Sequence, residues 1–345
     1  MDSLSEKTNK PDLNDPCRPK MTFPGIVLRL LCFILIFILL LTLLVIAIPD
    51  QFGKSYQRAL VRQYDYFKNL QGNKIVLIGG SSLSFGIDLD GMESLTGEQA
   101  AILGNHASYG LPYLLAMSKE NLIPGDKVII EFMNSPTDRT DAASLLLTGI
   151  GKRYDMYQFF VPEIRHSVLE EYPAYVRDNI KYWRTGKPYD PEIPYYLEAY
   201  DERGNMTLNR PDPWLTEDYI TKKNPDDLHF QDYYTMIRNL NYDLFAYLND
   251  YISWCEEKGV SVFLTVAPVY DDSVPEYCGD DVLDEYDSIL MENIHCPMIS
   301  RSKDYVLPRE YFFDSNLHCN TAGARLRTEM LCNDLKNYFD SSSAA

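Results

Sequence analysis

The stretch KIVLIGGSSLSFGID, residues 74–88, decides the expected fold of this chain. Residues 75–78 form a short, unbroken apolar run, which is typical of a strand covered on both faces of a sheet. Gly79 and Gly80 then make a turn, and small hydroxyl residues follow that can open a helix or a loop. In open α/β sheets, ligands bind beyond the carboxyl ends of the strands. The stretch therefore predicts an α/β fold with a candidate site directly after this strand.

Further apolar runs follow along the chain, and helical patterns lie between them. The other expected strands are 100–103, 128–132, 260–266 and 297–300. The expected helices are roughly 112–121, 236–258, 280–292 and 322–338. Because strands alternate with helices, we expect a mostly parallel sheet with helices on both faces. Residues 136–235 are more than one crossover helix needs, and we interpret them as an insertion that forms a lid or side wall near the site.

An uncharged apolar segment near the N-terminus, residues 30–48, predicts a membrane anchor. A helix of that length spans about 28 Å, close to the thickness of the hydrocarbon core. A buried core helix would keep a polar face, and this segment has none. We therefore expect a cytoplasmic tail over 1–23, a transmembrane signal-anchor over 24–49 and an extracytoplasmic domain over 50–345. Basic residues favour an N-terminus inside the cell, since they are more numerous before the segment than shortly after it.

Composition excludes some functions. The formal net charge of -18 makes nucleic acid an unsuitable partner, because phosphate binding needs a basic surface. The seven cysteines contain no C-x-x-C pair, so a zinc ribbon is not supported. No HExxH motif or histidine cluster occurs, and we expect neither a metal nor a cofactor. The cysteines are expected to be mostly ordinary buried thiols, and one or two disulfides remain open.

The turn after the first strand suits a serine nucleophile. It exposes a hydroxyl and can aim backbone N–H groups at a developing oxyanion. Taken alone, the segment is equally compatible with a strand-to-helix turn that carries a simple N-cap. A phosphate-binding loop is disfavoured because the Lys-Ser/Thr ending is missing, and the G-x-S-x-G elbow is missing too.

Residues 80–86, GSSLSFG, resemble the first block of SGNH (GDSL-like) hydrolases, G-D-S-L-[ST]-x-G. Ser82 falls on the nucleophile of that family, and Ser81 replaces the usual Asp. A serine at that place resembles the membrane-anchored branch, which contains DltD-like D-alanyl-transfer proteins and AlgX/AlgJ-like polysaccharide O-acetylation proteins. The resemblance implies a three-layer, flavodoxin-like sheet with helices on both faces, and Ser82 as nucleophile and oxyanion donor.

A second constellation lies near the C-terminus, in residues 311–323, YFFDSNLHCNTAG. A serine nucleophile needs a base, and the base needs a carboxylate that fixes its tautomer. His318 and Asp314 can supply both from one loop. The segment is similar to the last SGNH block, D-x-x-H, although Asp314 stands four residues before His318 instead of three. A surface histidine beside a helix-capping aspartate is the alternative for this segment alone.

Two middle blocks match the family less well. Residues 105–110, NHASYG, look like the second block, N-x-G-x-x-G, with Ala107 in place of the glycine that donates to the oxyanion. The resemblance implies that Asn105 and Gly110 contribute to substrate binding. Asn134, after the third strand, is a candidate third oxyanion donor, with an ordinary strand-end turn as its alternative. In the insertion, five aromatic residues could stack on sugars or simply pack: Tyr182, Trp183, Tyr195, Tyr196 and Trp214.

The resemblance implies a serine esterase or O-acyltransferase that acts outside the cytoplasm. Its substrate would be an acyl ester of cell-envelope polysaccharide or cell-wall polymer, and its partner a membrane-bound O-acyltransferase. The alternative is a catalytically inactive, membrane-anchored carbohydrate-binding or scaffold subunit of an acylation complex, which the poorly matching middle blocks motivate.

Overall fold

The computed structural model describes residues 23–132, 140–191, 195–207, 237, 240–271 and 280–343. The chain divides into two units, Met1–Pro49 and Asp50–Ala345. In the first unit, helix α1 (Phe23–Ala47) is long and apolar enough to cross a membrane. Its extent agrees with the segment expected from the sequence.

The second unit contains a sheet of four parallel strands in the order β2-β1-β3-β4. The strands are β1 (Lys74–Ile78), β2 (Gln99–Leu103), β3 (Lys127–Glu131) and β4 (Ser261–Thr265). Four of the five expected strands lie within two residues of their predicted bounds. The α/β prediction and its parallel sheet are confirmed.

The fifth expected strand, 297–300, is reduced to one parallel bridge between Met298 and Leu264. Pro297 lacks a backbone N–H and contributes only its carbonyl, to which Leu264 N donates. A separate short pair consists of β5 (Val269–Tyr270) and β6 (Val306–Leu307).

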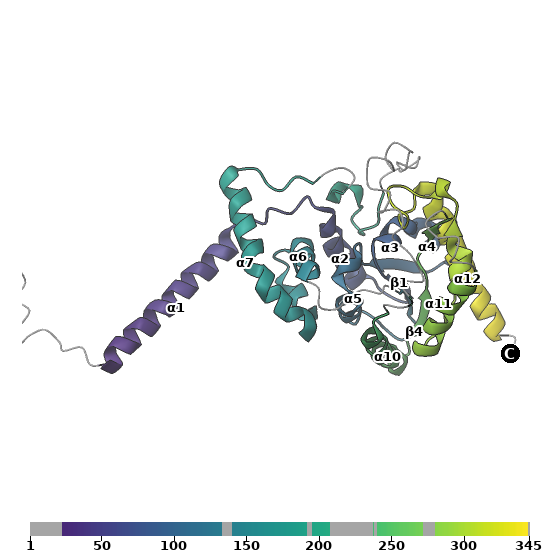
Figure 1. The fold of residues 1–345 in the computed structure, drawn as a ribbon, viewed down its shortest axis with the longest axis horizontal. Helices are drawn as coiled ribbons and strands as arrows, with labels where there is room; N and C mark the ends of the chain where they lie inside the picture. Colours follow the sequence, from purple (N-terminus) through teal and green to yellow (C-terminus); the bar gives the residue numbers. More distant parts are fainter. Residues whose placement is uncertain are drawn as a thin grey trace, which may run out of the picture. The chain divides into compact units, whose positions relative to one another are not determined.

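Helices cover both faces of the four-stranded sheet, because alternate side chains of the strands point to opposite sides. Val76 and Ile78 belong to one apolar core, whereas Ile75 and Leu77 belong to another. The first core includes side chains of α2 (Ala59–Asn69), α5 (Leu111–Ser118), α10 (Tyr242–Glu257) and α11 (Asp280–Asn293). The second includes side chains of α4 (Leu89–Thr96) and α12 (Thr321–Ser343). Figure 1 shows α2 and α5 on one side of the strands and α12 on the other.

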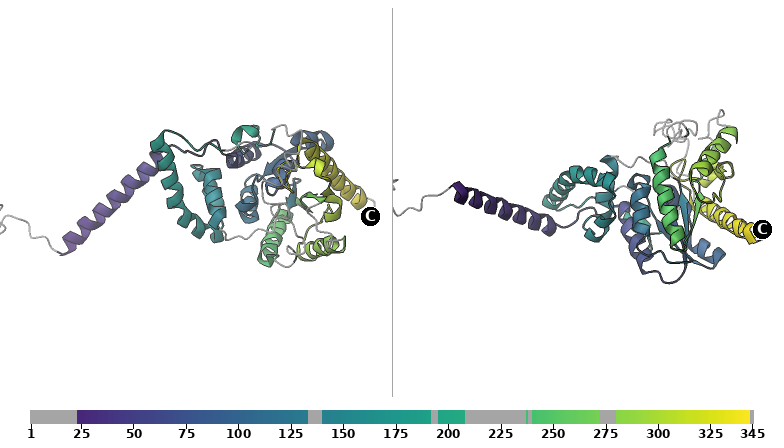
Figure 2. Two further views of the ribbon diagram at one scale, coloured as in Figure 1. Left: turned by 45° about the horizontal axis from the view of Figure 1, so that its top comes forward. Right: turned by 90° about the horizontal axis from the view of Figure 1, so that it is seen from below.

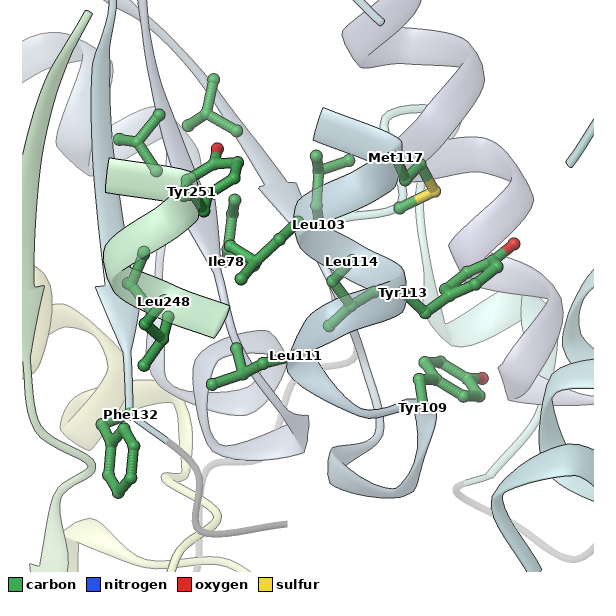
Figure 3. Packing of buried hydrophobic residues seen from close by; sticks show 14 of the residues in the cluster. Ile78, Leu103, Tyr109, Leu111, Tyr113, Leu114, Met117, Phe132, Leu248 and Tyr251 are labelled. Atoms are coloured by element: carbon green, nitrogen blue, oxygen red, sulfur yellow. The ribbon is translucent and has the colours of Figure 1, made fainter. Parts of the chain in front are cut away.

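The first core is the larger one. Figure 3 shows Ile78 and Leu103 from the strand ends meeting Leu111 and Leu114 of α5, with Leu248 and Tyr251 of α10 beside them. Burial of this apolar surface on both sides holds β1 in the middle of the sheet. The turn after β1 is therefore attached to the most buried strand of the domain.

Local sequence sets where α4 begins and ends. The Asp88 side chain accepts a hydrogen bond from Gly91 N and caps the first turn. Gly97 ends the helix with a φ of 72°, a left-handed conformation that glycine adopts without a steric penalty.

The region expected to be an insertion contains helices in its described parts. They are α6 (Thr140–Ile150), η3 (Tyr154–Phe159), α7 (Pro162–Thr185) and η4 (Leu197–Ala199). Helices α6 and α7 lie side by side (Figure 2, teal). Residues 195–207 return to the start of the domain, where Ser55 and Tyr196 form an antiparallel bridge next to η1 (Tyr56–Arg58).

Candidate active site

The candidate site lies where the chain leaves β1 and β2. The turns that follow these two strands lie close to each other: a Cβ atom on Gly104 would lie 1.9 Å from the Gly79 carbonyl oxygen. Gly104 also has a φ of 125°, so only glycine fits there. The chain passes from β1 to β2 on one side of β1 and then to β3 on the opposite side of β1. In α/β sheets, a crevice for ligands opens where the strand order reverses in this way.

Short helix α3 (Ser81–Gly86) begins immediately after Gly80, at the carboxyl end of β1. The loop before α12 reaches the same place and brings His318 to it. His318 Nε2 lies 2.9 Å from the Ser81 Oγ. His318 Nδ1 lies 2.8 Å from Asp314 Oδ1. With the proton on Nδ1 donated to Asp314, Nε2 is free to accept the proton of the Ser81 hydroxyl.

The structure brings together the two segments that the sequence singled out, but the serine whose hydroxyl faces His318 is Ser81. The expectation that Ser82 is the hydroxyl facing His318 is wrong by one residue. Consecutive residues of a helix point about 100° apart, so Ser81 and Ser82 cannot face the same partner. Ser82 Oγ instead donates a hydrogen bond to Glu131 Oε1, away from His318.

A buried ion pair lies beneath the serines. Arg327 of α12 donates to the Glu131 carboxylate at the end of β3, and their side chains are 0% and 1% exposed. Arg327 Nη1 also donates to the Ser82 carbonyl oxygen at 2.7 Å. A Cβ on Gly86 would lie 2.3 Å from Arg327 Nη1, so the glycine that ends α3 makes room for this guanidinium. The pair links α3, β3 and α12 in the core.

Asp314 is held by two donors. Besides His318, the Tyr195 hydroxyl donates to Asp314 Oδ2. The Asp314 side chain is 3% exposed and that of His318 13%. Burial raises the pKa of Asp314, but the hydrogen bond and charge of His318, together with the Tyr195 hydrogen bond, outweigh it, and the pKa lies below its ordinary value. Asp314 therefore stays an anion beside the imidazole.

Aromatic rings surround the histidine. The Phe85 ring stacks on the His318 ring, with centroids 4.0 Å apart and 9° between the planes. Tyr195 lies next to Phe85 and also contacts Tyr56, whose ring is 6.2 Å from that of His106. Burial raises the pKa of Tyr56, so its hydroxyl stays protonated. These contacts connect the three segments around residues 56, 106 and 195 to the Ser81–His318 pair.

Comparison with protein-family models and with curated proteins finds no match for this chain. The candidate site is therefore judged on its own geometry. A hydroxyl, an imidazole and a carboxylate in this order are the arrangement in which a serine loses its proton to a base whose tautomer the carboxylate fixes.

The residues of the second block have mainly structural contacts. Asn105 is fully buried, and its Nδ2 donates to the Tyr56 carbonyl oxygen at 2.8 Å. Gly110, with a φ of 76°, joins η2 (Ala107–Tyr109) to α5. The Ala107 side chain is exposed, and its carbonyl accepts a hydrogen bond from Gly110 N. Asn105 thus holds the segment that carries Tyr56, and oxyanion donation by Ala107 and Ser82 stays a prediction.

Two other expectations, Asn134 as oxyanion donor and Trp214 as sugar contact, lie outside the described residues. Among the residues that the structure does describe, no group of three or more His, Cys, Asp or Glu is arranged to hold a metal ion.

The described residues also include cysteines with free thiols: Cys32, Cys255, Cys296 and Cys332.

Several neighbours of the site were not identified from the sequence. Phe85 lies within the quoted GSSLSFG block, but the block gives it no role. For Tyr195 the sequence indicates an aromatic ring that stacks on sugars or packs, and no contact with Asp314. For Glu131 and Arg327 the sequence signal is faint: Glu131 is a charged residue inside the expected strand 128–132, whose other residues are apolar, and this is the one hint of a buried partner.

Proposed function

We propose that this chain is a serine hydrolase or acyltransferase with Ser81 as nucleophile, His318 as general base and Asp314 as the residue that orients the base. The observation that carries the proposal is the continuous set of contacts from Asp314 Oδ1 through the His318 ring to Ser81 Oγ, at 2.8 Å and 2.9 Å.

The proposed reaction begins when Ser81 Oγ attacks the carbonyl carbon of an acyl ester. His318 Nε2 takes the hydroxyl proton and later gives it to the leaving alcohol, so that the acyl group stays on Ser81. In the second half, water or another hydroxyl loses its proton to His318 and attacks the acyl carbon of the acyl-serine. The bond between that carbon and Ser81 Oγ then breaks, Ser81 Oγ takes the proton from His318, and the acid or the new ester leaves the free enzyme. Asp314 remains ionised throughout and stabilises the imidazolium that forms.

The fold supports the same proposal. The strand order β2-β1-β3-β4 is that of the first four strands in a flavodoxin-like sheet, the arrangement that the SGNH resemblance implies. The nucleophile sits on the turn after β1 and the base on the loop before the last helix, in agreement with the order of the first and last blocks in that family. The exact family remains part of the proposal.

We propose acyl esters of an envelope polysaccharide or cell-wall polymer as the substrate class, with a membrane-bound O-acyltransferase as partner. Apolar helix α1 supports this location, since it is able to hold the domain at a membrane. The N-terminus would be cytoplasmic and residues from about 50 onward extracytoplasmic.

The decisive experiment is labelling of the full chain with a fluorophosphonate probe, followed by mass spectrometry of the modified peptide. We expect the label on Ser81, complete loss in Ser81→Ala, and labelling that persists in Ser82→Ala. Ser108→Ala, which removes the hydroxyl of a serine of η2 outside the Ser81–His318–Asp314 set, serves as control. A label on Ser82 would overturn the choice of nucleophile.

Absence of labelling in a folded wild-type chain would overturn the enzymatic proposal as a whole. The chain would then be better described as an inactive carbohydrate-binding or scaffold subunit. Release of acetate from an acetylated glycan, compared between wild type and Ser81→Ala, tests the substrate class separately from the chemistry.

A further inference from the structure

Helix α7 is attached to the residues that directly follow the membrane helix. Gln51 N donates to Asn179 Oδ1 at 2.9 Å, and Tyr189 N donates to the Gln51 carbonyl oxygen at 3.0 Å. The neighbouring Phe52 ring contacts three tyrosine rings, those of Tyr175, Tyr182 and Tyr189. The C-terminal half of α7 and the segment after it are thus fixed to the start of the domain.

Chain connectivity limits how far this start can be from a membrane. Helix α1 ends at Ala47, and Gln51 comes four residues later. Four residues of fully extended chain reach about 14 Å at most. If α1 crosses a bilayer, Gln51 and the part of α7 bonded to it are therefore held close to the headgroups.

The charge of this part of α7 is opposite to that of the whole chain. Residues 174–187 contain four basic side chains and one acidic side chain, Asp178, which gives a net charge of +3 against -18 overall. All four basic side chains are exposed: Arg177, Lys181, Arg184 and Lys187. Trp183 lies among them and is 50% exposed. Basic residues next to an exposed tryptophan are the composition of a segment that lies at an anionic membrane surface.

An apolar hollow of about 410 Å³ lies beside the other half of the same helix. Its lining consists of Tyr157, Phe160, Arg165, Val168, Leu169 and Tyr172. Leu169, one of the lining residues, is 72% exposed, so the apolar lining of the hollow is accessible from outside. Arg165 is the one charged side chain of the lining, and its Nε donates to the Phe160 carbonyl at 2.9 Å.

Ring contacts join the lining of the hollow to the start of the domain. The Tyr172 ring, in the lining, lies 6.1 Å from the ring of Tyr175, which in turn stacks on Phe52 at 5.7 Å. One helix therefore offers an apolar hollow and a cluster of exposed cations, both joined to the segment that leaves the membrane helix.

We propose that α7 is a membrane-contact surface, and that the hollow takes an acyl chain of an anionic phospholipid whose headgroup lies against the basic half of the helix. This depends on α1 being in the membrane and is independent of the proposed esterase chemistry. Contact of α7 with the membrane would fix the orientation of the domain relative to the bilayer.

The test uses the full chain in vesicles of phosphatidylglycerol and phosphatidylcholine that contain a phospholipid with a photoreactive acyl chain. After irradiation, labelled tryptic peptides are identified by mass spectrometry. Labelling of peptides from α1 shows that the protein is inserted. We expect labelling also in the tryptic peptide that contains Leu169 and Tyr172, residues 166–177.

Leu169→Asp should lower labelling of that peptide roughly tenfold, the effect of removing one leucine from an apolar environment. Leu95→Asp is the matched control, because Leu95 is a 56% exposed leucine on α4, which packs on the opposite face of the sheet from α2 and α5. Labelling of α1 without labelling of residues 166–177 would overturn the proposal, and so would equal labelling in wild type and Leu169→Asp.

Charge is tested by the lipid composition. Labelling of residues 166–177 should fall when phosphatidylglycerol is omitted. It should also fall when Lys181, Arg184 and Lys187 are replaced by Gln, a variant that keeps the tryptic cleavage site at Arg177. Equal labelling in purely zwitterionic vesicles would overturn the role given to the basic cluster. Fluorophosphonate labelling of Leu169→Asp should equal that of wild type, which separates this surface from the proposed active site.

Discussion

The rings of Phe85 and His318 lie face to face, 4.0 Å apart between centroids and 9° from parallel. Phe85 belongs to the same short helix as Ser81, so α3 supplies both the hydroxyl that His318 contacts and the surface on which the imidazole rests. The ring is thereby fixed from one face by Phe85 and at its edge by Asp314. A side chain held in this way needs little reorganisation before proton transfer.

Phe85→Leu should therefore lower kcat of ester hydrolysis about tenfold with a smaller change in KM, because the imidazole loses its flat support and samples other rotamers. Steady-state kinetics on a p-nitrophenyl ester measure both constants. Tyr242→Leu, an exposed aromatic on α10, is the control and should leave both unchanged. Wild-type kinetics in a folded Phe85→Leu chain would contradict this role.

Asp314→Asn should lower kcat by about four orders of magnitude, since an amide favours the wrong imidazole tautomer. The same substitution should remove a pH-dependent part of the stability. The pKa of Asp314 lies below its ordinary value in the folded chain. Its ionised form thus stabilises the fold above the ordinary carboxyl pKa, and this contribution is lost as pH falls through the folded-state pKa.

The measurement is urea unfolding of wild type and Asp314→Asn over a series of pH values. We expect the difference in unfolding free energy to be largest near neutral pH and to shrink toward acid. A difference that grows as the pH falls would contradict the depressed pKa.

Features of the fold and the site that a short stretch of sequence specifies could be predicted, whereas features that depend on contacts between distant segments could not. The apolar runs 75–78 and 128–130 specify strands locally, since they are short, rich in β-branched residues and flanked by turn residues such as Gly79 and Gly125. The loop with Asp314 and His318 could be recognised because carboxylate and imidazole stand in one short segment. The register of the serines could not, because it depends on where α3 begins and on Arg327, a residue of α12, holding the Ser82 carbonyl.

Tyr195 illustrates the same limit. It comes from the long region between β3 and β4, and only the folded chain places its hydroxyl on Asp314. Its sequence context of tyrosines and prolines indicates an aromatic surface but gives no partner. Contacts between distant segments need tertiary packing that local patterns do not encode.

Two thiols, the buried Cys255 and the half-buried Cys296, give a prediction about reactivity. Burial raises the pKa of Cys255 to about 11 and that of Cys296 to about 12. Since the thiolate is the reactive form, both should be alkylated far more slowly in the folded chain than in urea at about pH 8. Iodoacetamide labelling followed by peptide mass spectrometry measures this. Fast labelling of Cys255 in the folded chain would contradict the burial that the structure shows.

Arg327 and Glu131 give the sharpest stability prediction. Both side chains are buried, so Arg327→Met leaves the Glu131 carboxylate in the core without its cation. We expect a loss of about 3–5 kcal/mol in unfolding free energy, the usual cost of breaking a buried ion pair from one side. Urea unfolding of the full chain in detergent measures it.

The double variant Glu131→Leu with Arg327→Met should recover much of that loss, because two apolar side chains leave no unpaired charge. It should nevertheless react poorly with the fluorophosphonate probe, since the Ser82 carbonyl loses the Arg327 guanidinium that holds the turn of α3. Recovery of both stability and probe labelling would mean that the pair does not position the serines. Stability regained with labelling still lost would show that Arg327 and Glu131 are retained for the geometry of the Ser81 turn and not for the stability of the core.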